Sequence, residues 1–246
     1  MTVETRPPAG SVEKANLIVM GNTGRRAAAT LLCSVLSAAP LRSEPMVCPD
    51  SVVSVTSGSS HVAETVCEAA AFAEEMFGQC NVPSLDRPVA IHVVEDLLDG
   101  CVALYHCGND KIEVLTPGKV DERRDPDGAF SFLPSKDYFR SIIVHELSHA
   151  AFDSVPCPFS SCAAANEYVA YSMQVMSLSE EEQRTFAARA DLDRKVSRDE
   201  LSKMILYFAP HRFAQRAWTH LQQRDDPCAF IGQITDGTVL LDREHF

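Results

Sequence analysis

The sequence predicts an α+β fold, with a strand-rich first half, a helical second half and two lobes that meet at a cleft. Short strand-like runs separated by turn signals, together with one helical pattern, occupy residues 51–115. Helical periodicity then dominates residues 136–223. The chain has 246 residues, of which 46% are hydrophobic and 23% charged, as is typical of a globular protein of one domain or at most two. These values exclude collagen-like, coiled-coil and wholly disordered proteins.

Charge and hydropathy exclude two classes of partner. The 22 Lys and Arg residues are outnumbered by 34 Asp and Glu residues, which gives a formal net charge of −12. A chain with this balance lacks the excess of cations that replaces counterions along phosphates, so we expect no nucleic-acid partner. No apolar run reaches the roughly 18–20 residues that a membrane-spanning helix needs, so we expect no membrane span.

Residues 1–43 have the features of a disordered N-terminus and a signal peptide for export. A pair of arginines precedes an apolar stretch over residues 27–40 that ends in small residues, which is the order of parts in a secretory signal. Met20 lies just before the arginines and is an alternative start of the chain. A flexible tail followed by a short buried helix is the competing interpretation. The signal interpretation predicts a single domain over residues 44–246, in a periplasmic or secreted protein.

The number of cysteines is consistent with the predicted export of the protein. Removal of the signal takes away Cys33 and leaves eight cysteines: Cys48, Cys67, Cys80, Cys101, Cys107, Cys157, Cys162 and Cys228. An even number in an exported chain predicts a disulfide framework, here of four bonds. We expect the close pairs Cys101/Cys107 and Cys157/Cys162 to form local loops. The alternative is a cysteine zinc cluster, which requires CxxC-like knuckles that this sequence lacks.

The first half of the predicted domain combines strands with one helix. Residues 61–77 place their apolar side chains on one wide helical stripe, and Gly78 follows at the position where glycine usually ends a helix. Composition and alternation predict strands over residues 51–56, 88–95, 101–107 and 111–115. The turn residues between the last three runs predict a β-meander, a row of consecutive antiparallel strands.

The second half is mostly helical. Residues 117–134 are charged and interrupted by Pro and Gly, which predicts a loop. Ser135 is then expected as the N-cap of a helix with an acidic residue in its first turn. Helices are predicted over residues 136–153, 163–177, 179–191, 197–208 and 210–223. Residues 230–241 are predicted as one or two strands around the Asp236-Gly237 turn.

The first of these later helices carries the chemistry, because it contains His-Glu-Leu-Ser-His at residues 145–149. Histidines four residues apart lie on one face of a helix, about one turn from each other, so His145 and His149 can bind one metal ion. Zinc accepts neutral imidazole nitrogens and prefers four ligands. Glu146 is rotated by roughly 100° about the helix axis, so it reaches a water molecule on the ion, as a general base must. The alternative is a structural helix with two hydrogen-bonded histidines and a surface glutamate.

A catalytic zinc site also needs a third protein ligand and an open position for water. Glu167 follows His149 by 18 residues, far enough for the chain to turn and return antiparallel, and its neighbours are mostly apolar. A carboxylate in such surroundings is costly unless it is paired or bound to metal. The alternative is an exposed first-turn glutamate favoured by the helix dipole. Asp153 lies about 12 Å along the helix from His145, so we expect it to bond a group behind the ligands or the following loop.

The motif HELSHAAFD, followed by NEYVAY, resembles the gluzincin branch of the zincin metallopeptidases, the branch that includes thermolysin. The resemblance covers roughly residues 141–172. It implies a zincin-like fold, the two histidines and Glu167 as ligands of Zn2+, and Glu146 as the base that activates the water. In the thermolysin pattern an Asp four residues after the Glu ligand supports the first His, whereas this chain has Tyr171. The gap between the two motifs is also slightly shorter here.

A gluzincin usually places a Tyr or His opposite its base to stabilise the oxyanion. The candidates are Tyr168, Tyr171, Tyr207 and His211, and each is alternatively a packing residue whose polar group is satisfied locally. We expect His106 and His220 to be structural or exposed, and Trp218 to lie in the core.

Together these features predict an exported, disulfide-stabilised zinc metallopeptidase that hydrolyses peptide bonds through a zinc-bound water activated by Glu146. An extended peptide or protein substrate would lie along the edge of the meander's last strand. The first alternative is a catalytically silent zinc-binding module of the cell envelope that acts in binding or inhibition, although such a module has no need of Glu146. The second alternative is a structural domain without metal.

Overall fold

The computed structural model of the protein describes residues 44–190 and 192–243. The predicted signal peptide over residues 1–43 therefore lies outside the described residues. Within them, no helix combines the length and the apolar character that crossing a membrane requires. The secondary structure mixes helices with one sheet, which confirms the predicted α+β class.

The strands form one mixed sheet in the order β1-β2-β3-β5-β4. They are β1 (Met46–Val47), β2 (Val53–Thr56), β3 (Val89–Val94), β4 (Ala103–His106) and β5 (Lys111–Leu115). The strands β2, β3 and β5 are parallel to one another, whereas the edge strands β1 and β4 run antiparallel to their neighbours. All the strands predicted for the first half are present, and β1 is an addition.

The predicted β-meander is wrong, because β3 pairs with β5 rather than with β4. The strands β4 and β5 form a hairpin, whose turn contains Gly108 at positive φ, and the hairpin docks on β3 through its second strand. Ile112, Val114 and Leu115 of β5 are buried, whereas Tyr105 is the buried residue of β4. The more apolar strand therefore takes the interior position, and β4 becomes an edge of the sheet.

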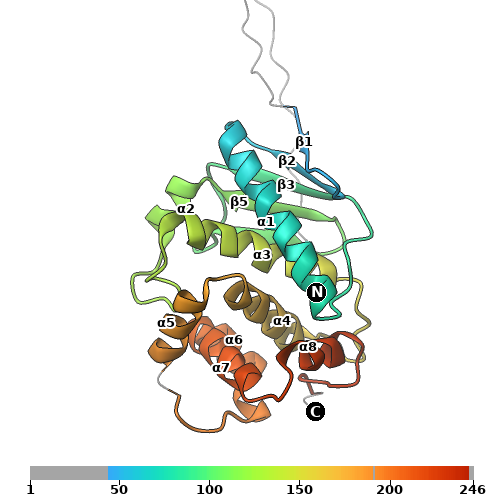
Figure 1. Ribbon diagram of the computed structural model, residues 1–246, viewed down its shortest axis with the longest axis vertical. Helices are drawn as coiled ribbons and strands as arrows, with labels where there is room; N and C mark the ends of the chain where they lie inside the picture. The colour runs from blue at the N-terminus through green and yellow to red at the C-terminus, as the bar shows by residue number, and fades with distance from the viewer. Residues whose placement is uncertain (1–43, 191, 244–246) are drawn as a thin grey trace, which may run out of the picture. The chain divides into compact units, whose positions relative to one another are not determined.

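Helix α1 (Ser60–Gln79) connects β2 to the parallel strand β3 and packs against β2 (Figure 1). Ser59 caps its N-terminus by accepting a hydrogen bond from a backbone N–H of the first turn. The predicted apolar stripe is buried, with Val66, Ala69, Ala70, Ala73 and Phe77 in the core. Gly78 does not end the helix as predicted. It keeps a negative φ, and the helix continues to a C-cap at Cys80.

The helices of the second half are α2 (Pro117–Arg123), α3 (Ser135–Phe152), α4 (Ala163–Met176), α5 (Glu180–Ala190), α6 (Lys203–Phe208), α7 (Pro210–Gln222) and α8 (Pro227–Thr235). Four of the predicted helices correspond to α3, α4, α5 and α7. The single helix predicted over residues 197–208 is instead a 3-10 turn at Arg198–Glu200 followed by α6.

The segment between the sheet and α3 is not entirely a loop, as was predicted for residues 117–134. It begins with α2, because Pro117 occupies the first helical position, where its fixed φ favours a helix and its missing N–H costs nothing. The N-cap of α3 is Pro134 rather than the predicted Ser135, which is already helical.

The predicted C-terminal strands over residues 230–241 are also wrong, because α8 occupies the first half of this stretch and the rest forms no strand. Asp226 is the N-cap of α8, and its side chain accepts a hydrogen bond from the backbone N–H of Ala229 at 2.9 Å. Ile231 and Ile234 are three residues apart, lie on one face of the helix and are buried. The chain then turns at Asp236-Gly237, as predicted, with Gly237 at positive φ.

Helix α3 lies between the sheet and the later helices α4 to α8 (Figure 1). On one side it contacts α1, β4 and β5, and on the other it packs along α4. Its buried residues, which come from all around the helix, are Phe139, Ser141, Ile142, Ile143, Val144, Glu146, Leu147, Ser148, Ala150, Ala151 and Phe152. Burial on all sides is typical of a helix inside a domain. Residues 145–149 are therefore held rigidly between two layers.

Three disulfides, Cys48–Cys67, Cys80–Cys228 and Cys157–Cys162, connect six of the described cysteines. The second bond joins the C-terminal end of α1 to α8, which lies 148 residues further along the chain. The third bond closes the loop between α3 and α4 and confirms a predicted local pair. Three disulfides are compatible with an exported protein.

The other predicted local pair is wrong, because Cys101 and Cys107 are both unpaired. Strand β4 lies between them. Its extended backbone rises about 3.3 Å per residue, so the strand alone holds its two ends about 10 Å apart. A disulfide requires Cα atoms within roughly 7 Å of each other.

Alkylation of the unreduced protein should therefore label Cys101 and Cys107 and none of the six cysteines in the three disulfides. Peptide mapping by mass spectrometry measures this pattern, and alkylation after reduction is the control that makes all eight accessible. Recovery of a Cys101–Cys107 disulfide peptide would contradict the extended strand between them.

Candidate metal centre

The two motif histidines face each other on α3, as their spacing predicts. The Nε2 atoms of His145 and His149 lie 3.1 Å apart, and the ring centroids are separated by 4.7 Å. Their side chains are 12% and 13% exposed, so a small part of each remains accessible to solvent. The residues around them on α3 are buried, and most of them are apolar, which limits the rotamers that the imidazoles can adopt.

Glu167 on α4 completes this group. Its carboxylate oxygens lie 3.6 Å from His145 Nε2 and 3.8 Å from His149 Nε2. The three residues each offer one ligand atom within 4.8 Å of the others, and together they are named the ligand cluster below. Ligands bound tetrahedrally at about 2.0–2.2 Å from one ion lie about 3.3 Å apart. The observed separations are close to this value, so the donor set fits a single metal ion.

Helix packing, rather than local sequence, brings Glu167 to the histidines. Glu167 is the fifth residue of α4, whose first turn contains no acidic residue, so the alternative of a first-turn glutamate does not apply. Its side chain is 27% exposed, and burial raises its pKa. A carboxylate in this position is most stable when it is ion-paired or bound to metal.

The protonation state of His145 suits metal binding. Burial and the neighbouring His149 lower the pKa of His145 well below its usual value. A neutral imidazole keeps a lone pair free for a metal ion, whereas a protonated one does not. The structure therefore holds His145 in its ligating form at neutral pH.

Glu146 lies outside the ligand cluster, as predicted, and is 7% exposed. Burial raises its pKa to about 7, His149 and the backbone of Tyr105 lower it, and Glu167 raises it. Its carboxylate is therefore close to His149, to Glu167 and to the backbone of Tyr105 on the edge strand β4. A carboxyl group with a pKa near neutrality can both accept and return a proton.

Asn166 is a residue of the site whose role was not predicted from the sequence. Its Oδ1 atom lies 2.8 Å from Nδ1 of His149. Because Nε2 of His149 faces the ligand cluster, Nδ1 carries the proton and donates it to this amide oxygen. The position of Asn166 directly before Glu167 was a usable signal, since adjacent residues on a helix can reach neighbouring parts of one site.

Tyr171 also lies at the cluster. Its ring packs edge-on against His145, with centroids 4.6 Å apart, and its other neighbours include Phe130 and Phe213. Burial raises its pKa, and the charges of Glu167 and Glu146 raise it further. The hydroxyl therefore remains protonated, and it is the candidate oxyanion donor that lies closest to the predicted chemistry among those examined from the sequence.

Asp153 and His211 lie elsewhere. Asp153 caps the end of α3, and its Oδ2 atom accepts hydrogen bonds from the Tyr105 hydroxyl and the backbone N–H of Gly108, both at 3.2 Å. It therefore anchors the β4–β5 hairpin to α3 instead of supporting a ligand histidine. The imidazole of His211, at the start of α7, lies 3.0 Å from the carboxylate of Asp125 and is half-exposed.

The other aromatic residues considered from the sequence are not part of the ligand cluster. The Tyr168 hydroxyl lies 2.9 Å from Nδ1 of His220, and burial lowers the pKa of His220 to about 4. Tyr207 is 69% exposed on α6. His106 pairs with Glu113 on the sheet at 2.6 Å, and Trp218 lies in the core as expected.

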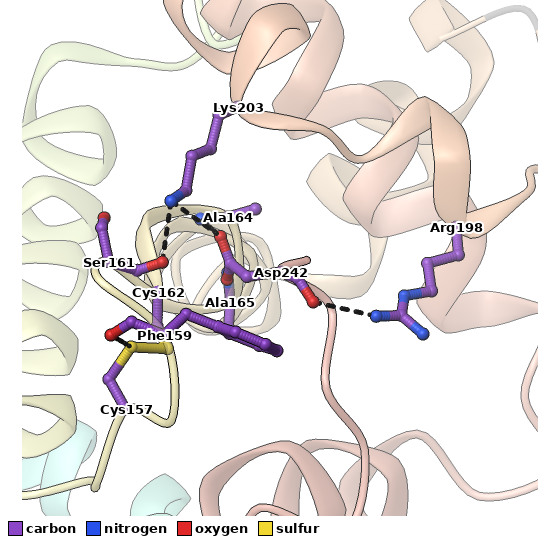
Figure 2. The surroundings of a disulfide bond; sticks show 9 residues. All are labelled: Cys157, Phe159, Ser161, Cys162, Ala164, Ala165, Arg198, Lys203 and Asp242. Carbon is purple, nitrogen blue, oxygen red and sulfur yellow. Dashed lines mark hydrogen bonds and ion pairs between the residues drawn. A yellow bond between two sulfur atoms is a disulfide. The ribbon is translucent and has the colours of Figure 1, made fainter. Parts of the chain in front are cut away.

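The N-terminus of α4 is fixed by a residue from the far end of the chain (Figure 2). The carboxylate of Asp242, which is 4% exposed, accepts hydrogen bonds from the backbone N–H groups of Ala164 and Ala165 at 3.1 and 2.9 Å. Lys203 Nζ lies 3.7 Å from the same carboxylate. A cap of this kind contributes about 1 kcal/mol to helix stability, and here it positions the helix that carries Glu167.

Residues 53–244 match a family of unknown function, DUF6639. Comparison with the curated proteins found no match, and comparison with the solved structures found none either. The matched segment contains the ligand cluster together with Glu146, Asn166 and Tyr171, and it spans most of the chain. The protein is therefore a member of the DUF6639 family.

Proposed function

We propose that this protein is an exported zinc-dependent metallopeptidase of zincin-like fold, related in its site to the gluzincins. One observation supports the proposal above all others. The ligand cluster of His145, His149 and Glu167 is assembled on two packed helices, and a buried carboxylate with a raised pKa, that of Glu146, lies next to it. A purely structural metal site has no use for such a carboxylate.

Zinc is the ion that this donor set favours. Two imidazole nitrogens and one carboxylate are a common set of protein ligands in catalytic zinc sites, which keep a further position open. When bound, the ion supplies Lewis acidity, which lowers the pKa of a water molecule and polarises a carbonyl group. Glu167 is the most exposed of the three ligands, so the open position is on the solvent-accessible side.

Glu146 would act as the proton carrier. Its carboxylate takes a proton from the attacking water and delivers it to the amine that leaves. The pKa of about 7 makes both transfers feasible near neutral pH. Tyr171 would contribute a hydroxyl that donates a hydrogen bond to the oxyanion, because its raised pKa keeps the proton in place.

The edge strand β4 is the proposed binding surface for substrate. It pairs only with β5 within the described sheet, so its other edge has unpaired backbone groups. It also contacts α3, which carries Glu146 and the two histidines. An extended peptide that added to this edge would pass beside the ligand cluster. The sequence had predicted that the last strand of the meander, now β5, would offer this edge. In the structure β5 is an interior strand, and β4 has the free edge instead.

Metal removal tests the proposed function. The purified protein should contain one equivalent of zinc, and a chelator should remove both the metal and the hydrolysis of a library of unstructured peptides. Addition of zinc should restore both. Elemental analysis and peptide mass spectrometry measure the two quantities on the same sample.

Two outcomes would contradict this proposal in different ways. A protein that binds zinc but cleaves no peptide in the library would support the alternative of a silent binding module. A protein that binds no zinc, although the cluster residues are intact, would exclude both the peptidase and that module.

A further inference from the structure

One polar atom at the centre of the site has no partner. The Nδ1 atom of His145 is buried and makes no hydrogen bond to any of the described residues. The opposite ring nitrogen, Nε2, faces His149 and Glu167. If Nε2 keeps its lone pair for a metal ion, Nδ1 carries the proton and needs an acceptor in a region that is closed to solvent.

Gln174 on α4 is the side chain placed to supply that acceptor. It is 4% exposed and follows Glu167 by seven residues, which is two helical turns on the same face. Its Nε2 atom donates a hydrogen bond to Ser141 Oγ at 3.2 Å. Ser141 lies one turn before His145 on α3, so the three side chains form a row along the α3–α4 interface.

The hydrogen bonds of Ser141 fix which end of the Gln174 amide faces the histidine. The Ser141 hydroxyl donates its only proton to the carbonyl of Tyr138 at 2.8 Å. It can therefore only accept from Gln174, which requires the NH2 group of the amide on that side. The amide oxygen is left pointing to the other side, with its lone pairs unused.

Gln174 and His145 are also neighbours in the folded chain. The Gln174 side chain lies near enough to the His145 imidazole to interact with it, although Nδ1 itself has no hydrogen-bond partner among the described residues.

We propose that Gln174 is a positioning residue of the metal centre, whose amide oxygen accepts the Nδ1 proton of His145 and so keeps the Nε2 lone pair directed at the ion. This inference rests on the proposed function only in assuming that the ion binds at Nε2. The proposal also explains why this chain differs from the thermolysin pattern at Tyr171. The chain has an aromatic ring where the related pattern has a carboxylate, and an amide one turn further along α4 supports the histidine instead.

On this proposal both histidines are supported by neutral amides, His149 by Asn166 and His145 by Gln174. A neutral acceptor polarises an imidazole less than a carboxylate does. The structure therefore predicts that a carboxylate at residue 174 strengthens metal binding, whereas an apolar side chain of similar size weakens it. A merely structural role for Gln174 gives no reason for these opposite effects.

The test compares Gln174→Leu and Gln174→Glu in the full chain, with Ser172→Ala as the control. Ser172 is a fully buried residue of the same helix, and its hydroxyl has no partner among the described residues. Competition with a chromophoric chelator measures the zinc dissociation constant. We expect Gln174→Leu to weaken zinc binding by about 10–100-fold, Gln174→Glu to bind at least as tightly as the wild type, and the control to be unchanged. Wild-type affinity in Gln174→Leu, or equal weakening in Leu and Glu variants, would overturn the proposal.

A second measurement separates this inference from the proposed function. In metal-free protein, the 15N chemical shifts of His145 report which ring nitrogen is protonated. We expect the Nδ1–H form in the wild type and a shift toward the Nε2–H form in Gln174→Leu. The Nε2–H form in the wild type would overturn the role of Gln174 whether or not the protein binds zinc. Absence of zinc binding in the wild type would contradict the proposed function alone.

If Gln174→Leu does not fold, the variants Ser141→Ala and Gln174→Glu replace it in the test, because both leave the α3–α4 interface nearly filled. Ser141→Ala removes the group that orients the amide, so zinc binding should weaken. Gln174→Glu should not weaken it. Effects in the same direction, or no effect of Ser141→Ala, would count against an oriented amide.

Discussion

Replacement of Glu146 by Gln should abolish hydrolysis while zinc remains bound at one equivalent. The amide has the shape of the carboxylate but cannot accept the proton of the attacking water, and none of the three proposed ligands is changed. Loss of a positioned general base typically costs about 10²–10⁴-fold in rate. Peptide turnover and zinc content are measured on the same preparation. Glu75→Gln, an exposed glutamate on α1, is the matched control.

The same variant has a pH-dependent effect on the stability of the metal-free protein. The pKa of Glu146 is about 7 when folded and 4.5 in its ordinary state. A raised folded-state pKa means that its contribution is fully present below pH 4.5 and is lost as the pH rises through 7. In urea unfolding, the wild type should therefore lose more stability across this window than Glu146→Gln does, by about 3 kcal/mol or less, because Glu167 also has a raised pKa and contributes to the loss in both proteins. Unchanged turnover by Glu146→Gln would exclude Glu146 as the proton carrier.

Replacement of Glu167 by Ala should remove tightly held zinc. Two histidines and water remain, and a site that loses one of its three protein ligands binds metal much more weakly. Glu167→Asp keeps the charge but shortens the reach by one methylene group, so zinc binding should weaken less and activity more. Zinc stoichiometry after gel filtration measures the retained metal.

The control for this prediction is Glu181→Ala, a glutamate in the first turn of α5. Its loss should cost only the helix-dipole contribution of about 0.3–1 kcal/mol and leave the zinc content unchanged. A full equivalent of tightly held zinc in Glu167→Ala would exclude the gluzincin-like ligand set. His145 and His149 would then need a third ligand from elsewhere.

Local periodicity determined the parts of the site that lie on one helix. The facing of His145 and His149 follows from the rotation of about 100° per residue along any α-helix, so a spacing of four residues is sufficient. The same rotation predicted that Glu146, the residue next to His145, would lie near the two histidines but would not bind the same ion. Glu167 was predicted from its apolar neighbours and its distance along the chain, and helix packing brings it to the histidines.

Other features of the site depend on contacts between distant segments. The sequence offers no local signal that Asp242 caps α4, because 77 and 78 residues separate it from the N–H groups that it binds. The role of Gln174 is similarly hidden, because it depends on the alignment of two helices that meet only in the folded chain.

The sequence by itself determined the α+β class, most helices and strands, the facing histidines with the glutamate next to them, and the Cys157–Cys162 pair. Only the tertiary structure decided the strand order, the unpaired state of Cys101 and Cys107, and the side chains that support the two histidines. The reason is physical. Periodicity and capping act over a few residues and can be read along the chain. Strand order and the choice of hydrogen-bond partners, in contrast, depend on which apolar surfaces are buried together when the whole domain packs.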